Sequence, residues 1–244
     1  MADSTTGERR TSLAGRILTR RTTNALRALL DNWLPPVLRE SRPFAWAVRI
    51  WLGPDALADF KYRAFRMSPE EFSAACARVE GKYSQRVTDT TPGQADWLAA
   101  TLGTAPVKVL EIGPGNGSLS ARLRDAGHDV WAVDIHSPDG DDHYVQGTVD
   151  KIPLPDKSVD VIVLAHVIEH VQSLTRAFLE LERVARDRIL IVTPKQRFFR
   201  WTFDYHLHFF YSVDHLASHV HRGKATGVEV DNDICMVWDV RPST

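Results

Sequence analysis

The sequence predicts an α/β fold: a doubly wound, mostly parallel sheet covered by helices on both faces, preceded by a helical extension or lid. From about residue 105, buried apolar runs alternate with helical patterns. A glycine-rich turn joins the first of these runs to the first helix. The first hundred residues differ, because five prolines between positions 35 and 69 divide them into short helical segments. We therefore expect a helical N-terminal extension over residues 1–100 and a sheet domain over residues 101–244.

The elements of the sheet domain follow from its hydrophobic pattern. Leu119 and Leu123 give one face of a short helix that ends at Gly127, and a second helix of apolar spacing covers 174–184. Ser212 is a suitable N-cap for a final helix. Short apolar runs predict strands at 107–112, 130–135, 144–145, 159–164 and 189–193, and a hairpin over 228–240 that turns at Asn232 and Asp233.

The N-terminal hundred residues contain one well-marked helix start, with Ser68 as N-cap and Pro69 as the first helical residue. Large aromatic residues, among them Trp33 and Trp46, need apolar cover. The sheet domain or the second subunit of a homodimer could provide it. The arginine-rich stretch 9–27 leaves a membrane-surface helix as the alternative.

Composition excludes several classes of protein. The chain has 244 residues, 43% of them hydrophobic, which suits a sizeable core rather than a disordered chain. Residues 101–244 carry 15 Lys and Arg against 20 Asp and Glu, a balance that disfavours nucleic acid as a partner. No apolar run approaches the roughly 18 residues of a membrane span, and no secretory signal is evident. We expect a cytoplasmic protein without stable membrane insertion.

The most informative segment joins the first predicted strand to the first helix and reads Glu111-Ile-Gly113-Pro-Gly115-Asn-Gly117. Glycines at such a turn let a ligand approach the backbone closely, and the next helix presents free N–H groups. The dinucleotide pattern GxGxxG would need glycine at Ser118, so NAD is disfavoured. Asp134 ends the second strand, where a carboxylate can accept hydrogen bonds from both hydroxyls of a ribose.

These features resemble the class I S-adenosylmethionine-dependent methyltransferases, in particular the small domain shared by many small-molecule methyltransferases. The resemblance covers roughly residues 105–195. It implies a Rossmann-like fold and S-adenosyl-L-methionine as the cofactor. It also implies that Glu111, Gly113 and Gly115 face the methionine moiety and that Asp134 faces the ribose. The matching motifs are the glycine segment with Gly117, Val133-Asp134, residues 147–153 and Ile168-Glu169-His170-Val171.

Residues 147–154 are similar to the family loop beside the adenine. Thr148 stands where the family usually has an acidic residue, so the adenine contact would pass to Thr148, to Asp150 or to the backbone around Val149. The link from Asp134 to the third strand is also short for the family.

A first histidine cluster, His166-Val-Ile-Glu169-His170, follows the fourth predicted strand and spells HxxEH, the inverted zinc-peptidase pattern. That motif needs both histidines on one continuous helix, whereas His166 directly follows a strand, which disfavours a peptidase. In the methyltransferase pattern Glu169 and His170 start a helix under the cofactor. His170 is then a catalyst or a structural hydrogen bonder, and His166 is the stronger candidate to face the cofactor or the acceptor.

A second cluster follows the fifth predicted strand. Alternation in an extended segment would put Asp204, His206 and His208 on one side, with aromatic residues opposite. We consider three roles for these histidines: a general base oriented by Asp204, ligands of a divalent cation together with Glu169 and His170, or structural ties.

Together these features predict a methyltransferase that acts on a hydroxyl of a small or medium polar acceptor. A saccharide or glycosylated metabolite is favoured, because aromatic rings can stack on the faces of a sugar while neighbouring histidines and acidic residues bind its hydroxyls. A quinone or other lipid-like acceptor and a non-catalytic cofactor-binding scaffold are the alternatives.

Overall fold

The computed structural model describes residues 29, 33–44, 46–47, 63–77, 90–135, 142–198 and 205–241. The chain divides into two compact units. The first comprises residues 1–60, 74–85 and 199–204, and its described part includes helix α2 (Pro36–Arg39). The second comprises residues 61–73, 86–198 and 205–244 and contains the whole sheet. Most of the expected N-terminal extension and the candidate residue Asp204 therefore lie outside the described residues.

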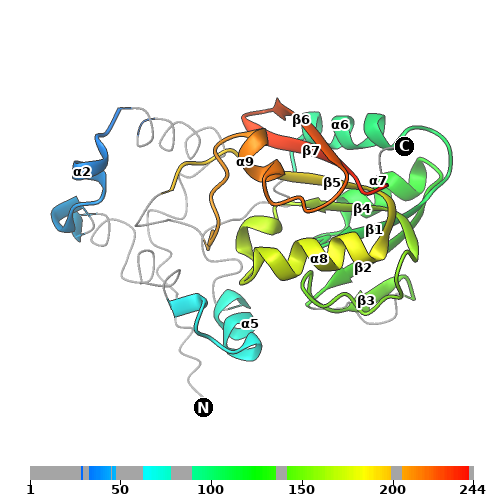
Figure 1. Ribbon diagram of the computed structural model, residues 1–244, viewed down its shortest axis with the longest axis horizontal. Helices are drawn as coiled ribbons and strands as arrows, with labels where there is room; N and C mark the ends of the chain where they lie inside the picture. Colours follow the sequence, from blue (N-terminus) through cyan, green and yellow to red (C-terminus); the bar gives the residue numbers. More distant parts are fainter. Residues whose placement is uncertain are drawn as a thin grey trace, which may run out of the picture. The chain divides into compact units, whose positions relative to one another are not determined.

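The sheet has seven strands in the order β3-β2-β1-β4-β5-β7-β6 (Figure 1). The five strands from β3 to β5 pair in parallel, whereas β7 runs antiparallel to both β5 and β6. The predicted mostly parallel, doubly wound sheet is confirmed. Its strands are β1 (Lys108–Ile112), β2 (Asp129–Asp134), β3 (Tyr144–Gln146), β4 (Val159–Ala165), β5 (Ala185–Pro194), β6 (Lys224–Val230) and β7 (Asp233–Asp239).

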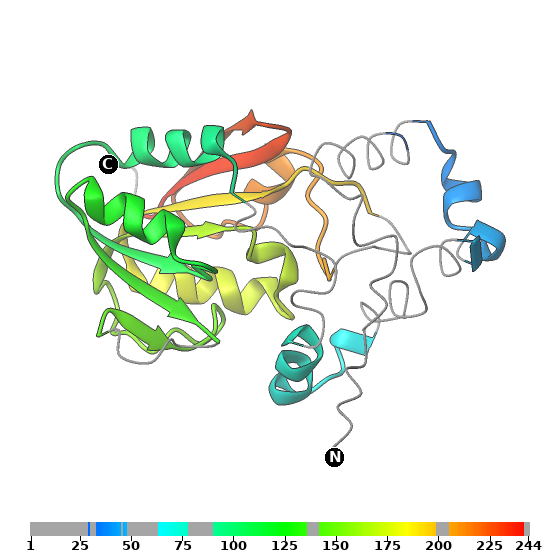
Figure 2. The same cartoon turned by 180° about the vertical axis from the view of Figure 1, so that it is seen from behind.

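Helices cover both faces of this sheet. One face carries α8 and α9 (Figure 1), and the other carries α6 and α7 (Figure 2). In the described ranges no helix has the length and the apolar character that crossing a bilayer requires. The four helices on the sheet are α6 (Pro92–Leu102), α7 (Ser118–Asp125), α8 (Leu174–Val184) and α9 (Val213–Ala217). The described part of the chain also contains α5 (Pro69–Ala77) and the 3₁₀ turn η3 (Ile168–His170).

Polar caps fix where several helices start. At α5, Ser68 Oγ accepts from the N–H of Glu71 at 3.2 Å, and Glu71 Oε2 accepts from the N–H of Ser68 at 2.9 Å, so the predicted cap is a complete capping box. At α9, Ser212 Oγ accepts from the N–H of His215 at 3.1 Å, as the sequence predicts.

The C-terminal hairpin corrects one prediction. Val230 pairs with Asp233, so the turn consists of Asp231 and Asn232, both at positive φ (51° and 71°), one residue earlier than expected. Two successive positive φ values are typical of a type I′ turn, which suits asparagine and aspartate. Asp233 instead begins β7, where its carboxylate accepts a hydrogen bond from Gln94.

The core has two layers because successive strand residues face opposite sides. In β4, Val161 and Val163 belong to the apolar cluster under α6 and α7, whereas Ile162 and Leu164 belong to the cluster under α8 and α9. Phe178 of α8 stacks on Trp238 of β7 with ring centroids 5.6 Å apart. Strands β1, β4 and β5 are therefore apolar on both faces, as buried parallel strands are.

Glu111 places a carboxyl group inside this core. The residue is 3% exposed, and Ser120 Oγ of α7 donates a hydrogen bond to its Oε2. Burial raises the pKa of Glu111 to about 7, although the Ser120 hydroxyl and the charge of Arg124 act in the opposite direction. The carboxyl group therefore titrates close to neutral pH.

This burial predicts a pH dependence of folding stability. Above pH 4.5 the unfolded chain has lost the Glu111 proton, whereas the folded protein keeps it up to about pH 7, so stability falls as the pH rises through this window. The loss between pH 5 and pH 7 is about 2 kcal/mol. Glu111→Gln removes this titrating group. Urea titrations at pH 5 and pH 7 measure how far the free energy of unfolding drops between the two pH values, and this drop should be about 2 kcal/mol smaller in the variant than in the wild type. Equal pH slopes in the two proteins would contradict the buried carboxyl group.

Candidate functional site

The loops that follow β1, β2, β4 and β5 meet at one edge of the sheet because these strands are parallel. Gly113 follows β1, Asp134 ends β2, His166 follows β4 and Gln196 lies just beyond β5. The topology thus brings the predicted cofactor residues and the first histidine cluster to the carboxyl edge of one sheet.

The glycine loop is open to a ligand on part of its length. Gly113, Gly115 and Gly117 have φ values of 65°, 56° and 74°, which glycine adopts without strain. A Cβ atom on Gly113 would lie 2.6 Å from Val167 Cγ2, so this glycine lets the loop pack against the segment after β4. At Gly115 and Gly117, by contrast, no atom of the residues that the structure describes lies within 4 Å of the Cβ position. These two residues form an open, backbone-lined cradle before α7.

Asp134 lies beside the predicted adenine loop. Its carbonyl oxygen accepts a hydrogen bond from the N–H of Gly147 at 2.9 Å, and its side chain is half-buried. In the following turn Thr148 is exposed and Asp150 is half-buried, whereas Val149 is 7% exposed and packs in the core. Thr148 and Asp150 can therefore offer side chains at this edge, and Val149 can offer its backbone.

His166 has a left-handed backbone, with φ 58°, immediately after β4. A residue other than glycine rarely adopts this conformation, and such strain concentrates at functional sites. The ring lies between two carboxylates: Nδ1 is 3.6 Å from Glu169 Oε1, and Nε2 is 3.8 Å from Asp233 Oδ2. The unusual backbone thus accompanies a histidine held between acidic side chains.

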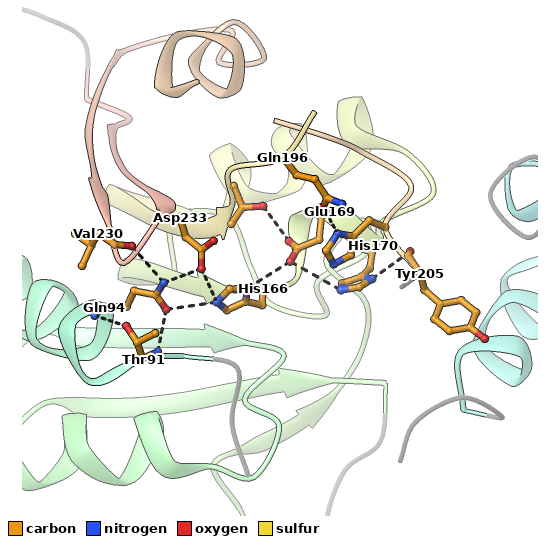
Figure 3. Close-up of polar contacts among 11 residues, drawn as sticks. Thr91, Gln94, His166, Glu169, His170, Gln196, Tyr205, Val230 and Asp233 are labelled. Carbon is orange, nitrogen blue, oxygen red and sulfur yellow. Dashed lines mark hydrogen bonds and ion pairs between the residues drawn. The ribbon is translucent and has the colours of Figure 1, made fainter. Parts of the chain in front are cut away.

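Gln94 and Asp233 are site neighbours that sequence reasoning missed. Gln94 Nε2 donates to Asp233 Oδ2 at 2.8 Å, and Gln94 Oε1 lies 3.4 Å from His166 Nε2 (Figure 3). Gln94 Oε1 also accepts from the N–H of Thr91 at 2.9 Å, so the capping box of α6 orients the amide. The spacing of Thr91 and Gln94 was a visible cap signature, but its place beside His166 depends on how α6 docks on the sheet.

Glu169 is the most enclosed acidic residue of this edge, at 1% exposed. Thr193 Oγ1 donates to its Oε2 at 3.1 Å, whereas Oε1 accepts no hydrogen bond from the described residues. Burial by itself raises the pKa of this carboxyl group, but interactions with His166, His170 and His206 outweigh burial and lower the pKa to about 2. Glu169 is therefore an ionised carboxylate in the interior.

The backbone of Glu169 also anchors the second histidine segment. Its carbonyl oxygen accepts hydrogen bonds from the N–H groups of Leu207 and His208 at 2.8 and 3.0 Å. These two bonds connect the segment after β5 to η3, although the two are far apart in the sequence. The two histidine clusters therefore lie side by side, as the cation role considered for them requires.

His170 and His206 come from different segments and each offers a ring nitrogen near the Glu169 carboxylate; Figure 3 shows His166 and His170 on either side of Glu169. His170 Nε2 is 3.9 Å from Glu169 Oε1, and the ring of His206 meets that of His170 edge to face with centroids 4.8 Å apart. One ligand atom from each of the three residues lies within 4.8 Å of the others. We call Glu169, His170 and His206 the Glu-His-His cluster.

His208 lies outside this cluster. Its Nε2 is 2.9 Å from the carbonyl oxygen of Val171, to which it donates, and its ring packs edge-on against Phe65 with centroids 5.7 Å apart. Burial lowers the pKa of His208, which favours the neutral ring. The expected Asp204 partner lies outside the described residues. Of the two predicted histidines, His206 therefore belongs to the Glu-His-His cluster, whereas His208 connects its own segment to the residue after η3 through a hydrogen bond.

The HxxEH sequence does not form a peptidase motif. His166 lies before the three-residue turn η3 and in a left-handed conformation, so it shares no continuous helix with His170. As the sequence predicts, the two histidines of the HxxEH segment do not lie on one continuous helix.

Comparisons with known proteins agree with this arrangement. A family model described as a methyltransferase domain matches residues 110–192. An uncharacterized methyltransferase of Mycobacterium tuberculosis is 32% identical over 127 residues, which are 49% of this chain and 51% of the relative. A malonyl-[acyl-carrier protein] O-methyltransferase of Pseudescherichia vulneris is 35% identical over 38% of this chain and 40% of the relative. The chain thus spans about half the length or less of these curated relatives.

A solved structure supports the fold over a longer stretch. The 1,6-didemethyltoxoflavin-N1-methyltransferase of Burkholderia thailandensis, solved with S-adenosylhomocysteine bound, has a TM-score of 0.50 at 17% identity. The match covers 75% of this chain and 90% of that protein. The family model, the glycine-loop motif and the strand order agree, and residues 110–192 therefore form a methyltransferase domain of the class I S-adenosylmethionine-dependent type.

Proposed function

We propose that this protein transfers a methyl group from S-adenosyl-L-methionine to an oxygen atom of a small-molecule acceptor. The observation that carries the proposal is the presence, on one sheet edge, of an open glycine cradle at Gly115 and Gly117 and of the Glu-His-His cluster. The glycine cradle can accommodate the methyl donor, and a histidine of the cluster can accept the proton of an acceptor hydroxyl. The Pseudescherichia relative is named as an O-methyltransferase, which supports oxygen as the acceptor atom.

The residues of the glycine edge fit the donor. The open space at Gly115 and Gly117 lets a ligand approach the backbone to a distance that a Cβ atom would prevent. Asp134 would accept hydrogen bonds from the ribose, and Thr148, Asp150 and the backbone of Val149 would contact the adenine. Glu111 and Gly113 would line the methionine side. When bound, the donor supplies a sulfonium whose methyl group is already electrophilic, so the protein needs no covalent nucleophile.

The chain's own contribution is to orient the acceptor, exclude water and handle a proton. An alcohol must lose its proton as it attacks, which favours a histidine within reach. His206 is the stronger candidate, because Gln196 orients its ring through a 2.7 Å contact between Oε1 and Nδ1. His166 is the second candidate, and its two carboxylate neighbours at 3.6 and 3.8 Å would stabilise a protonated ring.

For the acceptor we propose a hydroxylated ring compound, with a saccharide or glycosylated metabolite as first choice and a quinone as the rival. Phe198 and Tyr211 flank the histidine segment and are 53% and 56% exposed, and such rings stack on either kind of acceptor. Calorimetric titration of S-adenosylhomocysteine in the presence of saccharides or quinones will distinguish the two. The acceptor class that tightens binding is the substrate class.

Replacing Asp134 tests the ribose contact. Asp134→Ala removes a charged hydrogen-bond acceptor, so S-adenosylhomocysteine should bind more weakly by about 1 to 3 kcal/mol, or roughly 5- to 150-fold. Isothermal calorimetry at constant pH measures this change. Unchanged affinity would remove Asp134 from the donor site.

Two matched glycine substitutions test the cradle. Gly115→Ala and Gly127→Ala both put a side chain at a positive φ, 56° and 94°, and in the described part of the chain no atom lies within 4 Å of either new Cβ. Each should cost about 1 kcal/mol of stability through backbone strain. Only Gly115→Ala should also weaken S-adenosylhomocysteine binding, by about tenfold or more, because its methyl group enters the cradle. Equal affinities in both variants would mean that the donor does not approach Gly115.

Replacing His206 tests the handling of the proton. His206→Gln should lower turnover about 100-fold or more, because general acid–base groups contribute on this scale, while the affinity for S-adenosylhomocysteine stays unchanged. Single-turnover rates with the acceptor found by calorimetry provide the measurement. Wild-type turnover in this variant would exclude His206, and donor binding without turnover on any acceptor would favour the scaffold function.

A further inference from the structure

The Glu-His-His cluster brings together the atoms that commonly bind divalent transition metals. Glu169 and His170 come from η3, and His206 comes from the segment beyond β5. A carboxylate oxygen and two imidazole nitrogens lie within 4.8 Å of one another. This donor set, two histidines and one glutamate, is common in zinc sites that keep an open position.

The hydrogen bonds of the two histidines favour coordination. His170 Nδ1 lies 3.2 Å from the carbonyl oxygen of Tyr205, which can only accept, so the proton of the neutral ring is on Nδ1. The lone pair is then on Nε2, the atom that lies 3.9 Å from Glu169 Oε1. His206 Nδ1 lies 2.7 Å from Gln196 Oε1, which favours the same tautomer. Ligand histidines almost always donate their second nitrogen to an oxygen in this way.

The carboxylate is oriented as well. Thr193 Oγ1 donates to Glu169 Oε2 at 3.1 Å, which leaves Oε1 on the side of the histidines. Oε1 is buried and has no hydrogen-bond donor within 3.5 Å among the residues that the structure describes; His166 Nδ1 at 3.6 Å and His170 Nε2 at 3.9 Å are its ion-pair partners. A cation bound at Oε1 would give this buried negative charge a direct ligand contact that these longer distances do not provide.

We propose that Glu169, His170 and His206 bind one divalent transition-metal cation, for which Zn²⁺ is the best match to the ligand set. His208 is not a ligand, because its Nε2 donates to the carbonyl oxygen of Val171. Around an ion with ligand distances of about 2.0 to 2.2 Å, tetrahedral ligand atoms are about 3.5 Å apart, so the cluster must contract by about 1 Å. The side chain of His170 is 38% exposed, which leaves it room to move inward.

The cation would deepen the proposed function, on which this role rests. It would hold the acceptor hydroxyl and lower the pKa of that hydroxyl; His206 would then serve as a ligand, and the hydroxyl proton would pass to His166, the second base candidate. Val167 packs against Gly113 of the glycine loop and is two residues from Glu169, so a cation here and a donor in the cradle would lie at the same edge of the sheet.

Metal binding can be tested without any methyl transfer. Full-length protein freed of metal with a chelator is titrated with Zn²⁺ by calorimetry, and with Co²⁺ while the visible absorption spectrum is recorded. We expect one Zn²⁺ per chain with a Kd of micromolar or tighter, a Co²⁺ spectrum with visible ligand-field bands, and a rise in Tm with Zn²⁺.

Matched variants assign the ligands. Glu169→Gln and His170→Gln keep the size of each side chain and should weaken Zn²⁺ binding about 100-fold or more. His221→Gln, at an exposed histidine remote from the carboxyl edge, should bind Zn²⁺ like the wild type. Circular dichroism confirms folding, and because His170 is partly exposed, its variant remains informative if Glu169→Gln does not fold.

The outcomes separate this proposal from the proposed function. If the wild type binds no Zn²⁺, or if both cluster variants bind it like His221→Gln, the metal site is wrong, whatever the donor affinity. If Zn²⁺ binds as expected while S-adenosylhomocysteine does not, the metal site stands and the methyltransferase activity fails.

Discussion

Parallel pairing of β1, β2, β4 and β5 is the constraint on which the rest of the structure depends. Each of these strands delivers its following loop to the same edge of the sheet. The glycine cradle, Asp134, His166 and Gln196 are distant in sequence and meet there for this reason alone. Because helices cover both faces, the strands are mostly apolar, and apart from the buried Glu111 of β1 the candidate site residues lie in the loops and near the strand ends.

Two glutamates in the interior illustrate how the surroundings decide chemistry. Glu111 is buried beneath α7 with a hydroxyl donor, and its pKa is raised to about 7. Glu169 is buried as deeply, but three histidines surround it, and its pKa is lowered to about 2. A glutamate side chain in β1 therefore changes between its neutral and ionised forms near pH 7, whereas a glutamate side chain in η3 is negatively charged at that pH. A fixed charge suits an acceptor or cation site better than a group that titrates at neutral pH.

Glu169 also explains why the two histidine clusters act as one. Its carbonyl oxygen binds the backbone of residues 207 and 208, its Oε2 binds Thr193 of β5, and its Oε1 faces His170. One residue thus connects η3, β5 and the segment beyond it. A buried charge is stabilised only by such multiple partners, since desolvation alone costs several kcal/mol.

The sequence by itself determined the strand and helix pattern, the glycine cradle and Asp134, because alternation, glycine spacing and strand ends are local properties of the chain. It also indicated both histidine clusters. It did not determine the position of the hairpin turn, because turns at Asp231-Asn232 and at Asn232-Asp233 differ only by a one-residue shift in the pairing of the two strands. Only the tertiary structure decided that His206 joins Glu169 while His208 binds the carbonyl oxygen of Val171, and that Gln94 and Asp233 enclose His166. These contacts connect residues 37 to 139 positions apart in the sequence. No local pattern encodes contacts over such separations; they depend on how the helices and loops dock on the sheet.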